Sequence, residues 1–390
     1  MELELSNKIF REDFDHNFFS NHFGKQYLHK KNLVNNFDEI VSLEILDDLL
    51  SKTNIWNNYN FIMMLDQKKI SYNDYSSLSF DITGSNNRPN VNKVQKLVSK
   101  GASIILNDIE KYNSNLLRVA DELQKLTHGR CQGNLYFSMA SHQAFGPHFD
   151  LHDVFAIHFE GKKIWNIYEN IENSPINHPA FRIPPEERVQ RAGKLIDQVT
   201  LNPGDLLYIP RGQYHDALAS EDGAIHVAFG LTYFKPIDLM SSIWEKFILN
   251  QFMRNDIKQN SSKEELKIIL SKFSKEIGNI IETDETLGIL ENNLKNWPYP
   301  IEEYSIKNLV LEGTRYDLSK TVKFHKRDNK SFLISGSNEV LVPSKFEKIT
   351  EFIFSKQYIT EKLLMSEFKD ISRKEIIECI NNLKNMKVLY

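Results

Sequence analysis

The stretch from Gly133 to Tyr233 constrains the fold of this chain more than any other part of its sequence. It consists of short apolar runs that are separated by Gly, Pro and Asn, with no long amphipathic helix between them. The runs that we predict to be strands are Leu135–Met139, Val154–Glu160, Lys163–Tyr168, Gln198–Leu201, Asp205–Ile209 and Ala224–Tyr233. Several strands at this spacing favour an antiparallel sandwich or barrel.

The rest of the chain has mainly helical periodicity. Ser114–Leu126 predicts a helix with Ser114 as its N-cap, and Gly101–Leu106 predicts a short strand. Further helices are predicted at Phe14–Phe23, Leu43–Leu50, Ile237–Asn255, Lys263–Ile281 and Asp284–Asn296. Beyond Pro298 and Pro300, helices over 345–355, 359–368 and 373–384 and a terminal strand, Val388–Tyr390, give a winged-helix-like α+β pattern. We therefore divide the chain into residues 1–235, a helical segment over 236–297, and a winged-helix-like domain over 298–390.

Composition excludes several classes of protein. With 41% hydrophobic residues and a net charge of −4 over 390 residues, the chain is neither disordered nor drawn to nucleic acid or membranes by a general basic field. Ser344–Tyr390 holds nine Lys/Arg and seven Asp/Glu, so we expect this domain to make protein contacts rather than to bind DNA. Two distant cysteines, and a start without an apolar signal segment, indicate a cytoplasmic protein.

The segment Phe145–Tyr168 carries the residues that point to chemistry. His148 and Asp150 are two residues apart, and on a strand this spacing places both side chains on one face. An imidazole and a carboxylate side by side are two of the three ligands of a 2-His-1-carboxylate triad, which leaves open positions on Fe(II). His215 fits the third position, because it lies 67 residues after His148 and follows a predicted strand and turn.

In these motifs the chain resembles the JmjC-type cupin oxygenases, and within them the ribosomal oxygenases. The latter hydroxylate arginine or histidine side chains of ribosomal proteins with Fe(II) and 2-oxoglutarate. The matching segments are GPHFDLHDVF at Gly146–Phe155, GKKIW at Gly161–Trp165 and PGDLLYIPRGQYH at Pro203–His215, with a further likeness over Phe18–Asn32. The resemblance implies a double-stranded β-helix catalytic domain, and a homodimer formed through the helical segment.

The resemblance also implies roles for individual residues. The metal ligands would be His148, Asp150 and His215, and the cosubstrate residues would be Lys163, Asn134, Tyr136 and His226. Lys163 matches the residue that pairs with the distal carboxylate of 2-oxoglutarate, where bacterial arginine hydroxylases tend to have arginine. His158 stands where a glutamine is usual, so its role and that of His226 stay open.

Three functions are consistent with these observations. The first is a hydroxylase of a ribosomal or similarly basic protein, and the second is a hydroxylase of a peptide natural product or another polypeptide. The third is a regulator that binds DNA and whose barrel only senses a small ligand, against which the near-neutral C-terminal domain argues. No feature of the sequence selects hydroxylation over demethylation.

Overall fold

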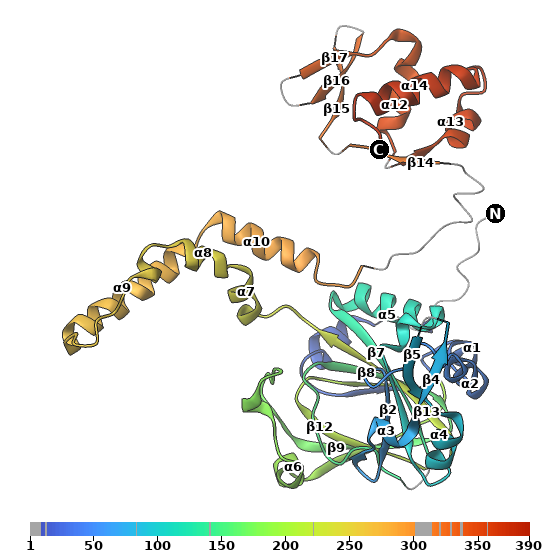
Figure 1. Ribbon diagram of the computed structural model, residues 1–390, viewed down its shortest axis with the longest axis vertical. Coiled ribbons are helices and arrows are strands. Elements are labelled where there is room, and N and C mark those ends of the chain that lie inside the picture. The colour runs from blue at the N-terminus through green and yellow to red at the C-terminus, as the bar shows by residue number, and fades with distance from the viewer. Residues whose placement is uncertain are drawn as a thin grey trace. The chain divides into compact units, whose positions relative to one another are not determined.

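The computed structural model describes residues 9–300 and 314–390, apart from positions 12, 13, 83, 140, 141, 221, 320, 328, 329, 336, 337 and 357. The chain divides into two compact units, Met1–Pro300 and Ile301–Tyr390 (Figure 1). None of the helices that the structure describes is both long and apolar enough to span a membrane.

The first unit is built on two antiparallel sheets. The larger has the strand order β1-β11-β8-β13-β7-β6-β2-β3, and the smaller has the order β10-β9-β12. The bounds are β1 Leu28–Lys30, β2 Phe61–Leu65, β3 Lys68–Lys69, β6 Ser103–Asn107, β7 Arg130–Ser138, β8 Asp153–Glu160, β9 Lys163–Ile171, β10 Leu195–Leu201, β11 Leu206–Ile209, β12 Gln213–Ala219 and β13 Ala224–Thr232. A separate ribbon pairs β4 (Ser76–Asp81) with β5 (Gly84–Pro89). These antiparallel sheets confirm the predicted sandwich or barrel class of the β-rich region.

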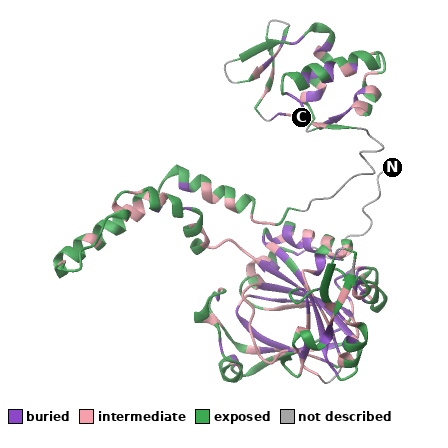
Figure 2. Ribbon diagram, viewed as in Figure 1, coloured by how far each residue is buried: buried purple, intermediate pink, exposed green. Residues whose placement is uncertain are grey.

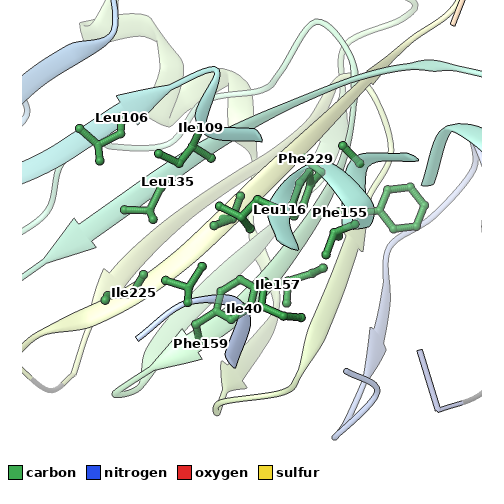
Figure 3. Close-up of a cluster of buried hydrophobic side chains, with 14 of the residues drawn as sticks. Ile40, Leu106, Ile109, Leu116, Leu135, Phe155, Ile157, Phe159, Ile225 and Phe229 are labelled. Carbon is green, nitrogen blue, oxygen red and sulfur yellow. The ribbon is translucent and has the colours of Figure 1, made fainter. Parts of the chain in front are cut away.

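The larger sheet packs on both of its faces. Along β8, Val154 and Ala156 join a cluster with Trp165 and Val199 of the smaller sheet, so the two sheets face each other. The alternate residues of β8 and β13 point the other way, into the main core (Figure 3). Members of this main core that Figure 3 labels are Ile40, Leu106, Ile109, Leu116, Leu135, Phe155, Ile157, Phe159, Ile225 and Phe229. The period of two along the strands therefore separates a core face from a face that lines the site.

Helices cover the core face and connect the strands. They are η1 Phe18–His22, α1 Phe37–Ile40, α2 Leu43–Ser51, α3 Tyr72–Tyr75, α4 Val91–Val98, η2 Ile109–Lys111, α5 Ser114–Thr127, η3 Pro179–Phe181 and α6 Pro185–Ala192. The predicted cap of α5 was wrong by one residue. The Asn113 side chain accepts hydrogen bonds from the backbone N–H groups of Asn115 and Leu116, while Ser114 is already helical.

The segment after β13 is helical, as predicted, but its first helix is interrupted. Pro236–Ser242 (α7) and Trp244–Leu249 (α8) are followed by a short turn, η4 Phe252–Arg254, in place of one helix over 237–255. The next two helices, α9 Lys263–Ile281 and α10 Asp284–Lys295, match the predicted bounds to within one residue. Exposed residues predominate over α9 and α10 (Figure 2).

The second unit has its own hydrophobic core, centred on Ile349, Ile376 and Leu383. Its helical elements are η5 Ser344–Phe346, α12 Glu347–Phe354, α13 Glu361–Glu367 and α14 Arg373–Asn385. Its strands are β14 Arg315–Asp317, β15 Lys323–Arg327, β16 Lys330–Ser335, β17 Asn338–Leu341 and β18 Tyr358–Thr360. The predicted terminal strand is reduced to a single bridge between Leu389 and Leu318.

Candidate metal and cosubstrate site

The three predicted metal ligands lie together. One ligand atom from each of His148, Asp150 and His215 lies within 4.8 Å of the others, and Asp150 Oδ2 is 3.5 Å from His215 Nε2. The predicted strand under His148 and Asp150 is absent, because both residues lie in the connection between β7 and β8. His215, in contrast, is on a later strand, β12, which begins directly after the predicted turn, as we expected of the third ligand.

Backbone hydrogen bonds between the β7–β8 connection and the segment 212–215 bring the ligands together, rather than a shared face of one strand. The backbone N–H groups of His148 and His215 donate to each other's carbonyl oxygens at 3.0 and 2.8 Å. The N–H of Gly212 donates to the carbonyl of Asp150 at 3.0 Å. Gly212 has φ +87° and a Cβ there would lie 2.0 Å from the Glu172 carbonyl oxygen, so this turn requires glycine.

Both candidate histidine ligands have the tautomer that metal binding needs. Nδ1 of His148 lies 2.9 Å from the Gly146 carbonyl oxygen, and Nδ1 of His215 lies 2.9 Å from that of Gln213. A carbonyl only accepts, so each Nδ1 carries the hydrogen and each Nε2 keeps its lone pair. Burial and the neighbouring His148 lower the pKa of His215 to about 4, which keeps that ring neutral near pH 7.

The candidate carboxylate is ionised in this setting. Burial by itself would raise the pKa of Asp150, but the imidazoles of His152, His215 and His148 lower it below its ordinary value. Two imidazoles and one carboxylate within reach of one point form a donor set that suits a divalent transition metal. The residues present therefore fit a metal ion such as Fe(II).

Lys163 lies in the same cavity, at the start of β9. Its side chain is only 4% exposed, and its ammonium donates to Ser138 Oγ at 3.1 Å and to His226 Nδ1 at 3.3 Å. No acidic side chain pairs with it among the described residues, and burial lowers its pKa to about 7. A buried lysine with one N–H to spare and no counter-ion fits an anionic ligand.

The other predicted cosubstrate residues lie on neighbouring strands. Tyr136 on β7 and His226 on β13 are in register, and their rings stack at 4.6 Å. Both line the cavity with Lys163. Burial raises the pKa of Tyr136, and burial with the nearby Lys163 lowers that of His226, so both side chains are neutral near pH 7.

One predicted residue, Asn134, and one residue whose role was left open, His158, remain to be placed. Asn134 is on the same strand as Tyr136 but is not among the side chains that line the cavity, and its Oδ1 accepts from the N–H of Asp108 at 3.4 Å. His158 is fully buried, and its Nε2 donates to the Gly161 carbonyl at 3.0 Å. Its Nδ1 has no hydrogen-bond partner in the described part of the chain.

The sequence analysis did not single out several residues that line the cavity or contact its residues. Ser138 shares strand parity with Tyr136 and could have been found from that spacing. Phe145 could not, because it lies in a connection whose path the sequence does not define. The cavity is lined by Tyr136, Ala144, Phe145, His148, Asp150, Val154, Lys163, Trp165, His215, Ala217, His226 and Ala228. The indole N–H of Trp165 is buried without a partner among the described residues.

The central part of the chain is similar to a known protein family. A family described as JmjC domain matches residues 106–239, the stretch that contains all three candidate ligands, Lys163 and His226. Residues 106–239 therefore match the JmjC domain family, and this match agrees with the facing sheets and the His-Asp-His cluster.

The more particular resemblance to ribosomal oxygenases is confirmed as well. A protein of Dictyostelium discoideum named bifunctional lysine-specific demethylase and histidyl-hydroxylase NO66 is 31% identical over 209 residues, which are 53% of this chain and 38% of that protein. Ribosomal oxygenase 2 of Bos taurus is 32% identical over 158 residues, which are 40% of this chain and 31% of that protein. The chain thus spans less than two fifths of the length of these relatives.

Solved structures show the same fold over a longer stretch. A structure of Escherichia coli YcfD aligns with 98% of this chain and 100% of its own, with a TM-score of 0.53 and 16% identity. A second structure, described as the E. coli ribosomal oxygenase YcfD with cobalt and 2-oxoglutarate, covers 96% of this chain and 97% of its own, with a TM-score of 0.51 and 16% identity.

Proposed function

We propose that this protein is an Fe(II)- and 2-oxoglutarate-dependent oxygenase that hydroxylates an arginine or histidine side chain of a ribosomal protein. One observation carries the proposal. The three candidate ligands lie within 4.8 Å of one another, in the same cavity as a buried lysine that no described acidic residue neutralises. Such an oxygenase needs a site for iron and, beside it, a cationic side chain that binds the distal carboxylate of 2-oxoglutarate.

In this proposal each residue has a defined task. His148, Asp150 and His215 hold iron, and Lys163 binds the distal carboxylate of 2-oxoglutarate. Ser138 and His226 take two of the three ammonium N–H groups and so direct the third. Three protein ligands would not fill the coordination of such a metal, so the cosubstrate could bind it as well.

When bound, iron supplies the oxidising chemistry: one O2 and one 2-oxoglutarate yield succinate and CO2, and one oxygen atom enters a C–H bond of the substrate. The protein's own residues orient the reactants and exclude water. Trp165 and Tyr136 line the cavity as large rings, and their contacts with His215 and His226 fix the walls. Asn134, on the same strand as Tyr136, is also proposed to hydrogen-bond the cosubstrate, as the family resemblance implies.

The substrate is proposed from the relatives. Two named relatives are a histidyl-hydroxylase and a ribosomal oxygenase, and a structural neighbour is described as a ribosomal oxygenase. A ribosomal protein is therefore the polypeptide that we expect to carry the modified side chain. A cytoplasmic location agrees with such a substrate and with two buried, free cysteines, Cys131 and Cys379.

We further propose that the protein is a homodimer formed through α7–α10, and that residues 298–390 form a winged-helix-like protein-contact domain. The 19-residue helix α9 contains no buried residue. Leu266, Leu270 and Phe273 lie at helical spacing along it and are 40%, 65% and 44% exposed. A second copy of the chain would cover this apolar stripe.

The proposed activity is tested by cosubstrate turnover. Purified protein with Fe(II) and O2 is expected to convert 2-oxoglutarate to succinate faster when ribosomal proteins are added, and His148→Ala is expected to abolish both rates. Failure of the unmodified protein to consume 2-oxoglutarate under any of these conditions would contradict the proposal.

A further inference from the structure

Six aromatic side chains form a closed ring around the cavity that holds the candidate ligands. The successive contacts are Phe145–Tyr136 at 6.4 Å, Tyr136–His226 at 4.6 Å, His226–Trp165 at 5.3 Å, Trp165–His215 at 5.8 Å, His215–His148 at 4.6 Å and His148–Phe145 at 5.6 Å between ring centroids. All six side chains line the cavity. Displacing one ring would therefore leave a gap in the wall.

Phe145 is the member of this ring with the weakest support from the barrel. Tyr136, Trp165, His215 and His226 are on strands of the two sheets, and His148 is bridged to His215. Phe145 lies on the connection between β7 and β8, outside any strand. Its position depends on what holds residues 142–147, which we call the Phe145 loop.

The tip of the β2–β3 hairpin contacts this loop. The backbone N–H of Gln67 donates to the Gln143 carbonyl at 3.0 Å, and the Gln67 side-chain amide donates to Gln143 Oε1 at 3.3 Å. His142 Nδ1 lies 3.0 Å from Asp66 Oδ1. Asp66 and Gln67 have φ of 46° and 64°, the left-handed pair that makes a tight hairpin turn and brings both residues to its tip.

The β2–β3 tip also contacts Gly146, the residue whose carbonyl orients the candidate ligand His148. A Cβ on Gly146 would be 2.6 Å from Oε1 of Gln67, so the glutamine side chain packs directly on the Gly146 backbone. The Gly146 carbonyl in turn holds Nδ1 of His148 at 2.9 Å. Ala144 of the loop is buried in a small hydrophobic cluster with Met64 of β2, so apolar packing adds to the hydrogen bonds between loop and hairpin.

We propose that the β2–β3 tip is a latch on the Phe145 loop, with Gln67 as a positioning residue that keeps Phe145 in the aromatic ring and Gly146 beside His148. With the latch in place, Phe145 completes the aromatic wall of the cavity, and this wall shields the cosubstrate from water. This consequence rests on the proposed function, whereas the latch itself is a property of the protein without any ligand.

The test uses the full-length double variant Asp66→Ala/Gln67→Ala, which loses the side-chain contacts and keeps the backbone bond to Gln143. Its control is Lys68→Ala/Lys69→Ala, because both lysines are exposed on strand β3 of the same hairpin. In metal-free protein, hydrogen exchange of the peptide covering 142–149 is expected to accelerate roughly fivefold or more, the effect of losing about one net hydrogen bond. The control is expected to exchange like the unmodified protein.

A second measurement separates the latch from the proposed function. With Mn(II) as the metal, the double variant is expected to bind 2-oxoglutarate roughly fivefold more weakly while its thermal midpoint stays at that of the control. Unchanged exchange over 142–149 would overturn the latch. If exchange responds but the unmodified protein itself binds no 2-oxoglutarate, the latch stands and the proposed function fails. Gln143→Ala removes the partner of Gln67 from the loop side and is expected to give the same acceleration.

Discussion

At the scale of single residues, Lys163 is the side chain that points most clearly to an anionic ligand. Burial lowers its pKa to about 7, so in the ligand-free protein the side chain loses its charge as the pH rises above that value. A bound carboxylate favours the ammonium form, so binding above pH 7 must include proton uptake. We expect the affinity for 2-oxoglutarate, measured by calorimetry with Mn(II), to fall up to about tenfold per pH unit between pH 7 and 9. A flat profile over this range would show that Lys163 does not bind the carboxylate.

Removing the charge tests the same residue independently. Lys163→Met keeps an apolar chain of similar length, and so we expect the protein to fold at least as stably. Its affinity for 2-oxoglutarate is expected to fall about 10- to 100-fold, because a charge-assisted hydrogen bond is lost, while binding of Mn(II) alone stays unchanged. Lys162→Met, at the exposed neighbouring position, is the matched control and is expected to bind both normally.

The residues of the site differed in how far the sequence could predict them. The triad was predictable, because ligands of one metal leave a recognisable spacing, whereas Lys163 was predicted only through the family resemblance of the GKKIW segment. Phe145 and Gln67 were not, because the hydrogen bonds between Gln67 and Gln143 join two connections 76 residues apart, and local spacing carries no information about them. Asn113 in place of Ser114 as the cap of α5 shows that two neighbouring polar residues compete for one position.

At the scale of elements, α9 has an apolar stripe that a single chain leaves exposed. Leu270→Asp places a charge in the middle of this stripe and is expected to convert the proposed dimer to a monomer, because burying an unpaired carboxylate costs several kcal/mol. Sedimentation velocity measures the change, with Ser271→Asp, at an exposed position of the same helix outside the stripe, as the charge-matched control. A monomeric unmodified protein, or a dimer that survives Leu270→Asp, would contradict the proposed interface.

Elements with regular periodicity were predicted well, and those held only by pairing were missed. The bounds of α9 match the prediction because its capping residue, Ser262, and its apolar spacing are local signals. Strand β5, with the sequence GSNNRP, has no apolar alternation and exists because it pairs with β4 across a hairpin. His148 and Asp150 show the opposite case. Their spacing is typical of a strand, but they lie in a connection that backbone hydrogen bonds from His215 and Gly212 hold in place.

At the scale of the whole molecule, the two compact units have separate hydrophobic cores. Ile376→Ala in the second core removes a fully buried side chain, and we expect it to cost about 2–5 kcal/mol of that unit's stability. The affinity of the first unit for 2-oxoglutarate is expected to stay unchanged. Hydrogen exchange resolved by peptide, together with calorimetry, measures both effects in the same protein. A loss of protection in β7–β13 would show that the two cores unfold as one.

The proposed function requires this site to add one oxygen atom to a ribosomal protein. The most direct measurement compares the masses of ribosomal-protein peptides from cells with the unmodified protein and from cells with His148→Ala. We predict one peptide that is lighter by a single oxygen atom in the variant cells, with the difference on an arginine or histidine. Identical peptide masses in the two cultures, with complete coverage of the ribosomal proteins, would contradict the proposed substrate.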